Sequence, residues 1–237
     1  MSPAKRKLPP GAKQRALEVV ERLAREYPEA HTELLHEDPF QLLVSVILSA
    51  QTTDERVNLV TPSLFKRYPD AAAFAVAEQT EVEEMIRPTG FFRSKARALR
   101  EMSQDVVQRH GGTVPRRMED LVQLRGVGRK TANVVLGVAF GSPGFAVDTH
   151  VMRLTYRLRL TYETDPVKIE EDICRTVPSE HWTDLSLRLI LHGRRVCQAR
   201  QPRCGVCVLA DICPSSYLGG DGRSARKQDR KRVRGRR

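Results

Sequence analysis

The sequence lacks an apolar run long enough to cross a membrane, and this absence limits the class of protein. A membrane-spanning helix needs ~18 or more consecutive apolar residues, and no stretch of the 237 residues approaches that length. The start, MSPAKRKLPPGAK, is basic but has no apolar region of the kind found in secretory signals. Because 40% of the residues are apolar, the chain can bury a core. We therefore expect a soluble globular protein with no membrane partner.

The sequence also lacks the alternation of apolar and polar residues that marks strands, and it has no internal repeat. Helix signals are frequent instead. Asp38 and Asp165 each precede a proline, as is typical of a capped helix start. The run QLLVSVILSA is apolar on nearly all sides and predicts a buried helix. A buried face after Asp165 is marked by Ile169, Ile173 and Val177. We predict an all-α fold with short connections.

Acidic residues are nearly absent from the two ends, which biases the net charge of +11. Residues 1–15 carry five basic side chains and no acid, and residues 223–237 carry nine against Asp229 alone. The ends together contribute +13, so residues 16–222 sum to −2. A nucleic-acid interface in the folded body must therefore come from local clustering of charge. The tail is too polar to pack, and we predict that it is disordered, either attracting polyanions or only aiding solubility.

The segment LRGVGRKTANVVLGVAF contains two glycines in front of a lysine and an apolar run. It predicts two helices over residues 116–140, joined by a turn of Arg125, Gly126, Val127 and Gly128. Glycine permits positive φ and close approach of another backbone, and the second helix presents unpaired N–H groups at its start. Such a turn either binds a phosphate or is an ordinary connection, and the following Arg129 and Lys130 favour the phosphate. Lys130 is then either a solvated charge or an amine held for chemistry.

Four of the five cysteines lie within 17 residues, with six, two and five residues between successive members. These are Cys197, Cys204, Cys207 and Cys213. Four thiolates so close in sequence can surround one metal centre, and the missing secretory signal argues against disulfides. The spacing accepts either zinc or a [4Fe–4S] cluster.

A local basic cluster accompanies these cysteines, because residues 185–210 contain five arginines and no acid. Arg200 and Arg203 lie between the first two cysteines, where a metal-pinned loop would hold them against phosphates. A solvated structural loop is the alternative. Asp148, which precedes a predicted helix, is explained by helix capping alone, or it also stabilises a developing cation or steers a nucleophile.

Taken together, LRGVGRKTANVV, AVDTH and the cysteine spacing resemble the endonuclease III family of DNA glycosylases and lyases, over about residues 13–214. The resemblance implies two helical lobes flanking a DNA-binding cleft, a helix-hairpin-helix motif and a [4Fe–4S] cluster rather than zinc. It implies a six-helix barrel at 32–142 and a cluster domain made of 13–31 with 143–214, between a basic extension at 1–12 and a tail at 215–237.

The same resemblance implies roles for individual residues. Lys130 matches the nucleophilic lysine, Asp148 the essential aspartate and the four cysteines the cluster ligands. Gln51 matches the residue that fills the gap left by an extruded nucleotide, and Phe91 falls where the family inserts an apolar wedge. The expected DNA contacts are Gln51, Phe91, Arg125, Gly126, Val127, Gly128, Arg129, Arg200 and Arg203.

The implied activity is base excision on duplex DNA. The enzyme would remove oxidised pyrimidines, form a Schiff base through its lysine and cleave the strand 3′ to the abasic site by β-elimination. We expect a monomer in the bacterial cytoplasm, associated with the nucleoid. Arg125 stands where the family usually has proline, and Phe91-Phe92 replaces a more common leucine-tyrosine pair. These departures concern the preference for damage and for the opposite base.

Three other functions are considered. A mismatch adenine glycosylase shares the cysteine pattern, but it generally lacks the lysine, has glutamate where Val46 stands and carries a further C-terminal domain. A non-catalytic DNA-binding module would use the same hairpin and cluster loop, with Lys130 only neutralising a phosphate. A ferredoxin-like electron carrier would not need the rest of the chain.

Overall fold

The computed structural model describes residues 7–218, and in that range it is built of helices without a strand, so the all-α prediction is confirmed. The chain forms two compact units. Unit 2 is His31–Ala146, and unit 1 combines Met1–Ala30 with Val147–Arg237. The basic tail that we predict to be disordered lies mostly outside the described residues. No helix in residues 7–218 has the length and apolar content needed to cross a bilayer.

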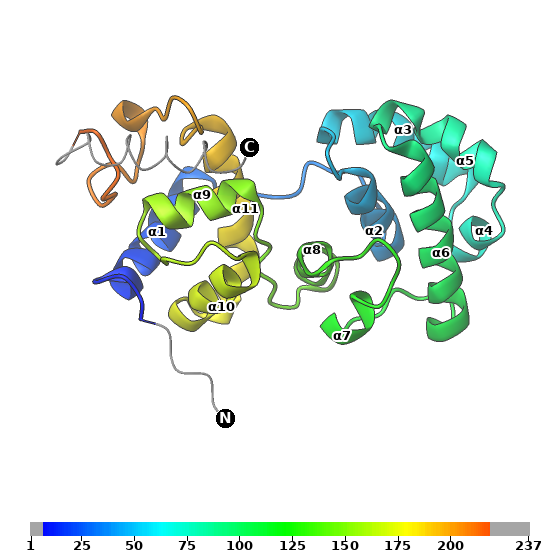
Figure 1. The fold of residues 1–237 in the computed structure, drawn as a ribbon, viewed down its shortest axis with the longest axis horizontal. Coiled ribbons are helices and arrows are strands. Elements are labelled where there is room, and N and C mark those ends of the chain that lie inside the picture. The colour runs from blue at the N-terminus through cyan, green and yellow to red at the C-terminus, as the bar shows by residue number, and fades with distance from the viewer. Residues whose placement is uncertain (1–6, 219–237) are drawn as a thin grey trace. The chain divides into compact units, whose positions relative to one another are not determined.

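Unit 2 is organised around a helix that is buried on all sides. This is α2 (Pro39–Leu48), in which every residue from Phe40 to Leu48 is buried. It contacts α3, α6 and α8 (Figure 1). The other helices of the unit are α3 (Asp54–Arg67), α4 (Ala71–Ala75), α5 (Gln79–Ile86), the 3-10 turn η1 (Arg87–Thr89), α6 (Phe92–His110), α7 (Met118–Leu121) and α8 (Arg129–Phe140).

The predicted helix starts are confirmed. The carboxylate of Asp38 accepts a hydrogen bond from the backbone N–H of Gln41 at 2.8 Å, so it satisfies one of the free donors at the start of α2. Asp165 does the same for the N–H of Lys168 at 3.0 Å. The prediction for residues 116–140 was less accurate, because α7 has only four residues and ends at Leu121.

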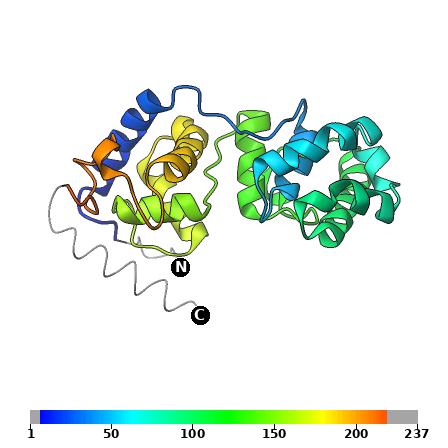
Figure 2. The same ribbon diagram turned by 90° about the horizontal axis from the view of Figure 1, so that it is seen from above.

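Unit 1 joins the start of the described chain to its end. Its elements are α1 (Ala12–Glu26), α9 (Thr149–Arg157), α10 (Pro166–Thr176), η2 (Ser179–His181), α11 (Trp182–Arg195) and η3 (Cys204–Val206). Helix α11 contacts both α1 and α9 (Figure 2). The predicted buried face of α10 is confirmed, since Ile169, Ile173 and Val177 are all buried.

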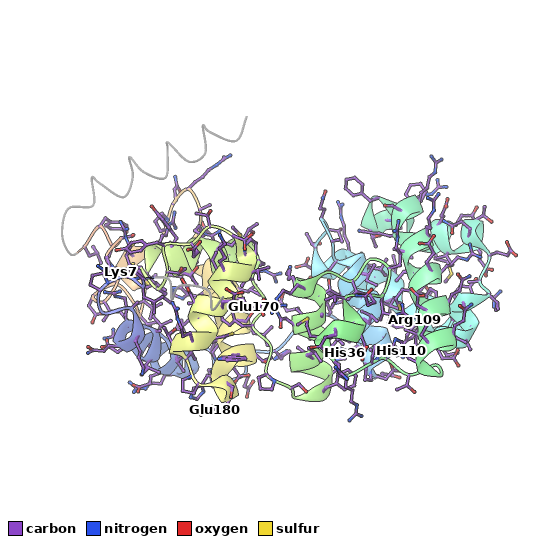
Figure 3. All side chains as sticks on the ribbon, turned by 60° about the horizontal axis from the view of Figure 1, so that its bottom comes forward. Lys7, His36, Arg109, His110, Glu170 and Glu180 are labelled. Carbon is purple, nitrogen blue, oxygen red and sulfur yellow. The ribbon has the colours of Figure 1, made fainter. Side chains whose placement is uncertain are left out.

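Charged side chains cover the outer faces of the helices in each unit. Figure 3 labels Arg109 in the last turn of α6, where its positive charge complements the negative end of the helix dipole. Arg109 also lies 4.0 Å from Asp105, one turn earlier on the same helix. These surface groups keep the helices soluble and leave the interior to apolar side chains.

Candidate functional site

The glycine turn of unit 2 is held from beneath by apolar side chains. Leu121, Leu124 and Val127 are buried in the same core as α2. Gly126 has φ +77°, and a Cβ atom at this position would lie 3.1 Å from the Cβ of Ala98 on α6. Gly126 is therefore required by the fold, both for its backbone conformation and for its packing.

Val127 was expected to contact DNA, but its side chain and its amide both face the interior of the protein. Its side chain is 5% exposed, and its N–H donates to the carbonyl of Leu124 at 3.1 Å. Both the side chain and the amide of Val127 are therefore engaged inside the protein, where they support the turn. The DNA contact expected of Val127 stays a prediction.

Gly128 differs from Gly126, because no atom of the described residues 7–218 fills the space beside it. Its φ of −88° suits any residue, and a Cβ atom there would have no neighbour within 4 Å. Gly128 is the N-cap of α8 and provides no side-chain cap, so it leaves the first N–H groups of the helix available. Arg129 and Lys130 lie exposed in this first turn. Helix dipole, exposed backbone and basic side chains together are features suited to binding an anion.

Arg125, the other basic residue of the turn, is held in an ion pair. Its Nε lies 3.2 Å from Oε2 of Glu101 on α6, and both side chains are well exposed. Arginine in place of the family's usual proline adds a positive charge to the turn. In the structure, part of that charge is neutralised by Glu101.

Helix α8 also fixes the segment that leads to Asp148. The side-chain amide of Asn133, one turn after Lys130, donates to the carbonyl of Phe145 at 3.3 Å. A Cβ atom at Gly144 would lie 2.4 Å from the carbonyl oxygen of Asn133, so only glycine fits there. The helix that carries Lys130 therefore anchors the chain only three residues before Asp148.

Asp148 is the N-cap of α9, as its capping interpretation predicts. Oδ1 accepts a hydrogen bond from the N–H of Val151 at 2.8 Å, and the residue is half-buried. Val151 and Leu154 are buried on the inner face of the same helix. The cap fixes the position of the carboxylate, so a second role can be built on a rigid group.

Gln51 and Phe91 share two unusual properties. Both adopt left-handed backbone conformations, with φ of 56° and 48°, which are unfavourable for residues other than glycine. Both are also exposed, Phe91 at 65%. Phe91 is thus no core aromatic; its neighbour Phe92 packs against the core instead. Strained and exposed side chains of this kind are typical of functional positions.

The four clustered cysteines from Cys197 to Cys213 in unit 1 are half-buried thiols without a disulfide. The thiols are close enough to influence one another electrostatically. Among the described residues, however, no three His, Cys, Asp or Glu side chains are arranged so that they could hold a metal ion as they stand. Burial raises the pKa of Cys207 and of Cys213 to about 11. Four thiols on one short segment are the donor set that iron–sulfur clusters use, so the residues present fit such a group.

Two arginines of α9 hold the backbone of this segment. Arg157, which is 8% exposed, donates to the carbonyls of Gln198 and Ala199 at 2.8 Å each. Its guanidinium also lies 3.4 Å from Sγ of Cys197. Arg153 donates to the carbonyl of Cys197 at 3.1 Å. Neither arginine could be singled out from the sequence, since arginine at these positions is also typical of the polar face of an ordinary helix.

A buried histidine approaches a second cysteine. His192 is 1% exposed, with Nδ1 3.1 Å from the hydroxyl of Tyr27 and Nε2 3.3 Å from Sγ of Cys207. Burial lowers the pKa of His192 to about 4, so the ring is neutral at neutral pH. If the tyrosine hydroxyl donates to Nδ1, the Nε2–H is left to donate to the sulfur. The signal in the sequence was the histidine five residues before Cys197.

The arginine cluster of residues 185–210 divides into structural and exposed members. Arg188 is 9% exposed and donates to the carbonyl of Tyr27 at 3.1 Å, so it belongs to the interior. Arg200 and Arg203 are exposed on the loop between the first two cysteines. The exposure of these two loop arginines is compatible with the phosphate contacts expected of them.

Comparisons with known proteins agree with this fold and with an iron–sulfur loop. The family model for the HhH-GPD superfamily of base excision DNA repair proteins matches residues 44–179. The model for the iron–sulfur binding domain of endonuclease III matches residues 197–213. A helix-hairpin-helix repair protein with an iron–sulfur loop is therefore the class that the chain represents.

Individual relatives narrow the class. Endonuclease III of Synechocystis sp. is 53% identical over 86% of this chain and 94% of its own length. Endonuclease III of Escherichia coli is 41% identical over 85% and 95%. A solved structure of a trapped covalent intermediate of endonuclease III with DNA has a TM-score of 0.81 at 40% identity, covering 85% of this chain and 95% of that one. The chain belongs to the endonuclease III family of DNA glycosylases with abasic-site lyase activity.

The iron–sulfur match also decides between the two metals that the spacing allows. The segment that it covers begins and ends at the first and the last of the four cysteines. The cofactor is a [4Fe–4S] cluster, and zinc is excluded as the resident metal of this family's domain.

Proposed function

We propose that this enzyme removes oxidised pyrimidines from duplex DNA with Lys130 as the nucleophile, and then cleaves the strand 3′ to the abasic site. The observation that carries the proposal is the placement of Lys130. It lies exposed in the uncapped first turn of α8, directly after a glycine with open space beside it. An amine at an anion-binding helix start lies beside any phosphate bound there, and so within reach of the adjoining sugar.

The damaged nucleotide must first leave the base stack. Extrusion costs a few kcal/mol, less for a damaged base than for an intact one. Gln51 would fill the gap and Phe91 would enter between bases of the opposite strand, which offsets that cost. Their exposure and left-handed backbones support these roles. Phosphate contacts from the N–H groups at the start of α8, from Arg129 and from Arg125 would hold the bent duplex.

The chemistry then needs a neutral amine. The nitrogen of Lys130 attacks C1′, the bond to the base breaks, and loss of the ring C–O bond gives a Schiff base. A proton leaves C2′, the 3′ C–O bond breaks, and water releases the enzyme. Because Lys130 is exposed in the protein, we assign its desolvation to bound DNA. Asp148 stabilises the positive charge that develops on the sugar, or assists proton transfer at the amine.

The cluster loop of unit 1 would contribute binding rather than bond breaking. When bound by Cys197, Cys204, Cys207 and Cys213, the cluster supplies a rigid crosslink of the loop. Arg200 and Arg203 are exposed on that loop and would contact phosphates. We assign unit 2 to the barrel domain and unit 1 to the cluster domain of the family. We expect the enzyme to act as a monomer in the bacterial cytoplasm, associated with the nucleoid.

Borohydride trapping tests this function. The substrate is duplex DNA with one thymine glycol, and the intact protein is compared with Lys130→Ala and Asp148→Asn. We expect a covalent protein–DNA band that disappears with Lys130→Ala and weakens with Asp148→Asn. A band that persists without Lys130 would assign the nucleophile to another residue, and tight binding without any band would leave a non-catalytic DNA-binding protein.

A further inference from the structure

A buried lysine of unit 2 lies between the two strained loops. Lys95, in the first turn of α6, is 6% exposed. Its ammonium donates to the carbonyl of Leu48 and to the carbonyl of Thr89, each at 2.8 Å. No part of the proposed chemistry uses this residue.

Both acceptors are the last residues of their elements. Leu48 ends α2, three residues before Gln51, and Thr89 ends η1, two residues before Phe91. Carbonyls at helix ends lack partners in their own helix, so Lys95 provides what α2 and η1 cannot. One side chain thereby connects the bases of the two loops that carry the exposed, left-handed residues.

The Phe91 loop is held from its other side as well. The N–H of Lys95 donates to the carbonyl of Phe91 at 3.1 Å, and the hydroxyl of Ser94 donates to the same oxygen at 2.9 Å. Lys95 therefore bonds the loop before and after Gly90 through its two nitrogens. The start of the Gln51 loop is held to α2 by Ser49, whose N–H donates to the Ser45 carbonyl at 2.9 Å and whose hydroxyl donates to the Val46 carbonyl at 2.8 Å. The bonds further along the loop are longer, with Ala50 N–H to Ile47 carbonyl at 3.4 Å and Thr52 N–H to Ser49 carbonyl at 3.2 Å.

We propose that Lys95 is a positioning residue that fixes the Gln51 and Phe91 loops relative to each other, so that both side chains enter the DNA stack together. The inference rests on the proposed function of those two residues. Stacking between bases opposes the insertion of a side chain, and two loops that move independently would be displaced by this resistance. Burial lowers the pKa of Lys95 to about 8, so keeping an ammonium at this site has a desolvation cost. Its presence is explained by the two carbonyls that it joins.

The test uses Lys95→Met, which keeps the length of the side chain but donates to neither carbonyl. The control is Met102→Ala, a truncation seven residues further along α6 at a fully buried position away from both loops. Insertion is measured on duplex DNA with a tetrahydrofuran abasic analogue opposite 2-aminopurine, whose fluorescence reports its stacking without bond cleavage. Lyase activity is measured on duplex and on single-stranded abasic DNA, since the single strand has no stack to fill.

We expect Lys95→Met to lose the fluorescence change and to lower duplex kcat/KM about 10- to 100-fold, as misplacement of loops by about 1 Å can do. Its activity on single-stranded DNA should equal that of the unchanged protein. Met102→Ala should lower Tm but keep the ratio of duplex to single-strand activity. A normal fluorescence change, or an unaltered ratio in Lys95→Met, would overturn the proposal.

Two further outcomes are decisive. If Lys95→Met does not fold, Lys95→Gln, which can reach one carbonyl at most, takes its place with the same criteria. If neither Lys95→Met nor Lys95→Gln folds, Lys95 serves the fold alone and the proposal is overturned. If the unchanged protein cleaves neither substrate, the proposed function fails, and the fluorescence comparison still decides the role of Lys95.

Discussion

The glycine turn of unit 2 and the cysteine loop of unit 1 are both irregular segments, but they are held in place in different ways. The turn rests on buried Leu121, Leu124 and Val127, within the apolar core. In the loop from Cys197 to Cys213, Leu209 alone is buried. The loop depends on hydrogen bonds from Arg153 and Arg157 and on its cofactor. We therefore expect the glycine turn of unit 2 to keep its conformation without a cofactor. The cysteine loop of unit 1 should lose its conformation when the cofactor is removed.

Removing one cluster ligand tests this difference most strongly. Cys204→Ala should release the cluster and loosen Arg200 and Arg203. Because a hydrogen bond to a charged group contributes about 1.5–3 kcal/mol, loss of one or both contacts should weaken DNA binding about 10- to 100-fold or more. Iron content and the Kd for duplex DNA with an abasic analogue are measured together. Cys174→Ala, on α10, is the matched control and should change neither. A soluble, iron-free Cys204→Ala protein with full affinity would remove the structural role of the cluster.

The second prediction concerns Lys95, the buried charge of unit 2. Burial lowers its pKa from 10.5 to about 8 in the folded protein. Between these values the unfolded chain binds a proton that the folded chain does not, so the free energy of unfolding rises with pH. Below pH 8 both states are charged and this contribution is constant. Relative to Lys95→Met, we expect the free energy of unfolding to rise by about 2 kcal/mol between pH 7.5 and 9.5. Urea denaturation at a series of pH values measures this rise. Parallel curves for the two proteins would show that Lys95 does not titrate in this range.

The two glycines of the turn should separate stability from binding. Gly126→Ala introduces a residue at φ +77° and a contact of 3.1 Å with Ala98, so it should destabilise unit 2 by about 1–3 kcal/mol. Gly128→Ala has free space and an ordinary φ, and it should cost less than about 1 kcal/mol, the loss expected at an N-cap. If DNA backbone lies beside Gly128, that second variant should lose affinity although it remains folded. Equal affinity in the Gly128→Ala protein would place the phosphate elsewhere.

Much of the fold could be predicted because its signals are local. Asp38 and Asp165 cap their helices, and the apolar run after Pro39 is buried, as aspartate-proline pairs and periodicity indicate. The short α7 was not predicted correctly. Its apolar residues Leu121 and Leu124 look helical in sequence, but Leu124 packs as part of a turn because the core of unit 2 accepts it there.

The supports of the site were hidden for a different reason. Lys95, Arg157 and His192 are polar residues that become buried only when distant segments come together. Lys95 bonds a carbonyl 47 residues away, and His192 meets Tyr27 across 165 residues. No spacing in the sequence announces such contacts, whereas the four cysteines are close enough to be recognised as a set.

The smallest effect is expected at Arg125, where the turn carries an exposed ion pair with Glu101. Such pairs contribute about 0–1 kcal/mol, so neither Arg125→Ala nor Glu101→Gln should change stability measurably. Their effects on DNA binding should be opposite. Glu101→Gln releases the guanidinium for a phosphate, so the logarithm of the DNA-binding constant should fall more steeply with the logarithm of the salt concentration. Arg125→Ala should make this slope shallower by up to about one. The double variant should match Arg125→Ala, because Glu101 acts only through the arginine. The opposite result would be that Glu101→Gln strengthens DNA binding equally in the unchanged protein and in the Arg125→Ala protein. Glu101 would then repel DNA directly, and the turn would bind phosphate through α8 without help from Arg125.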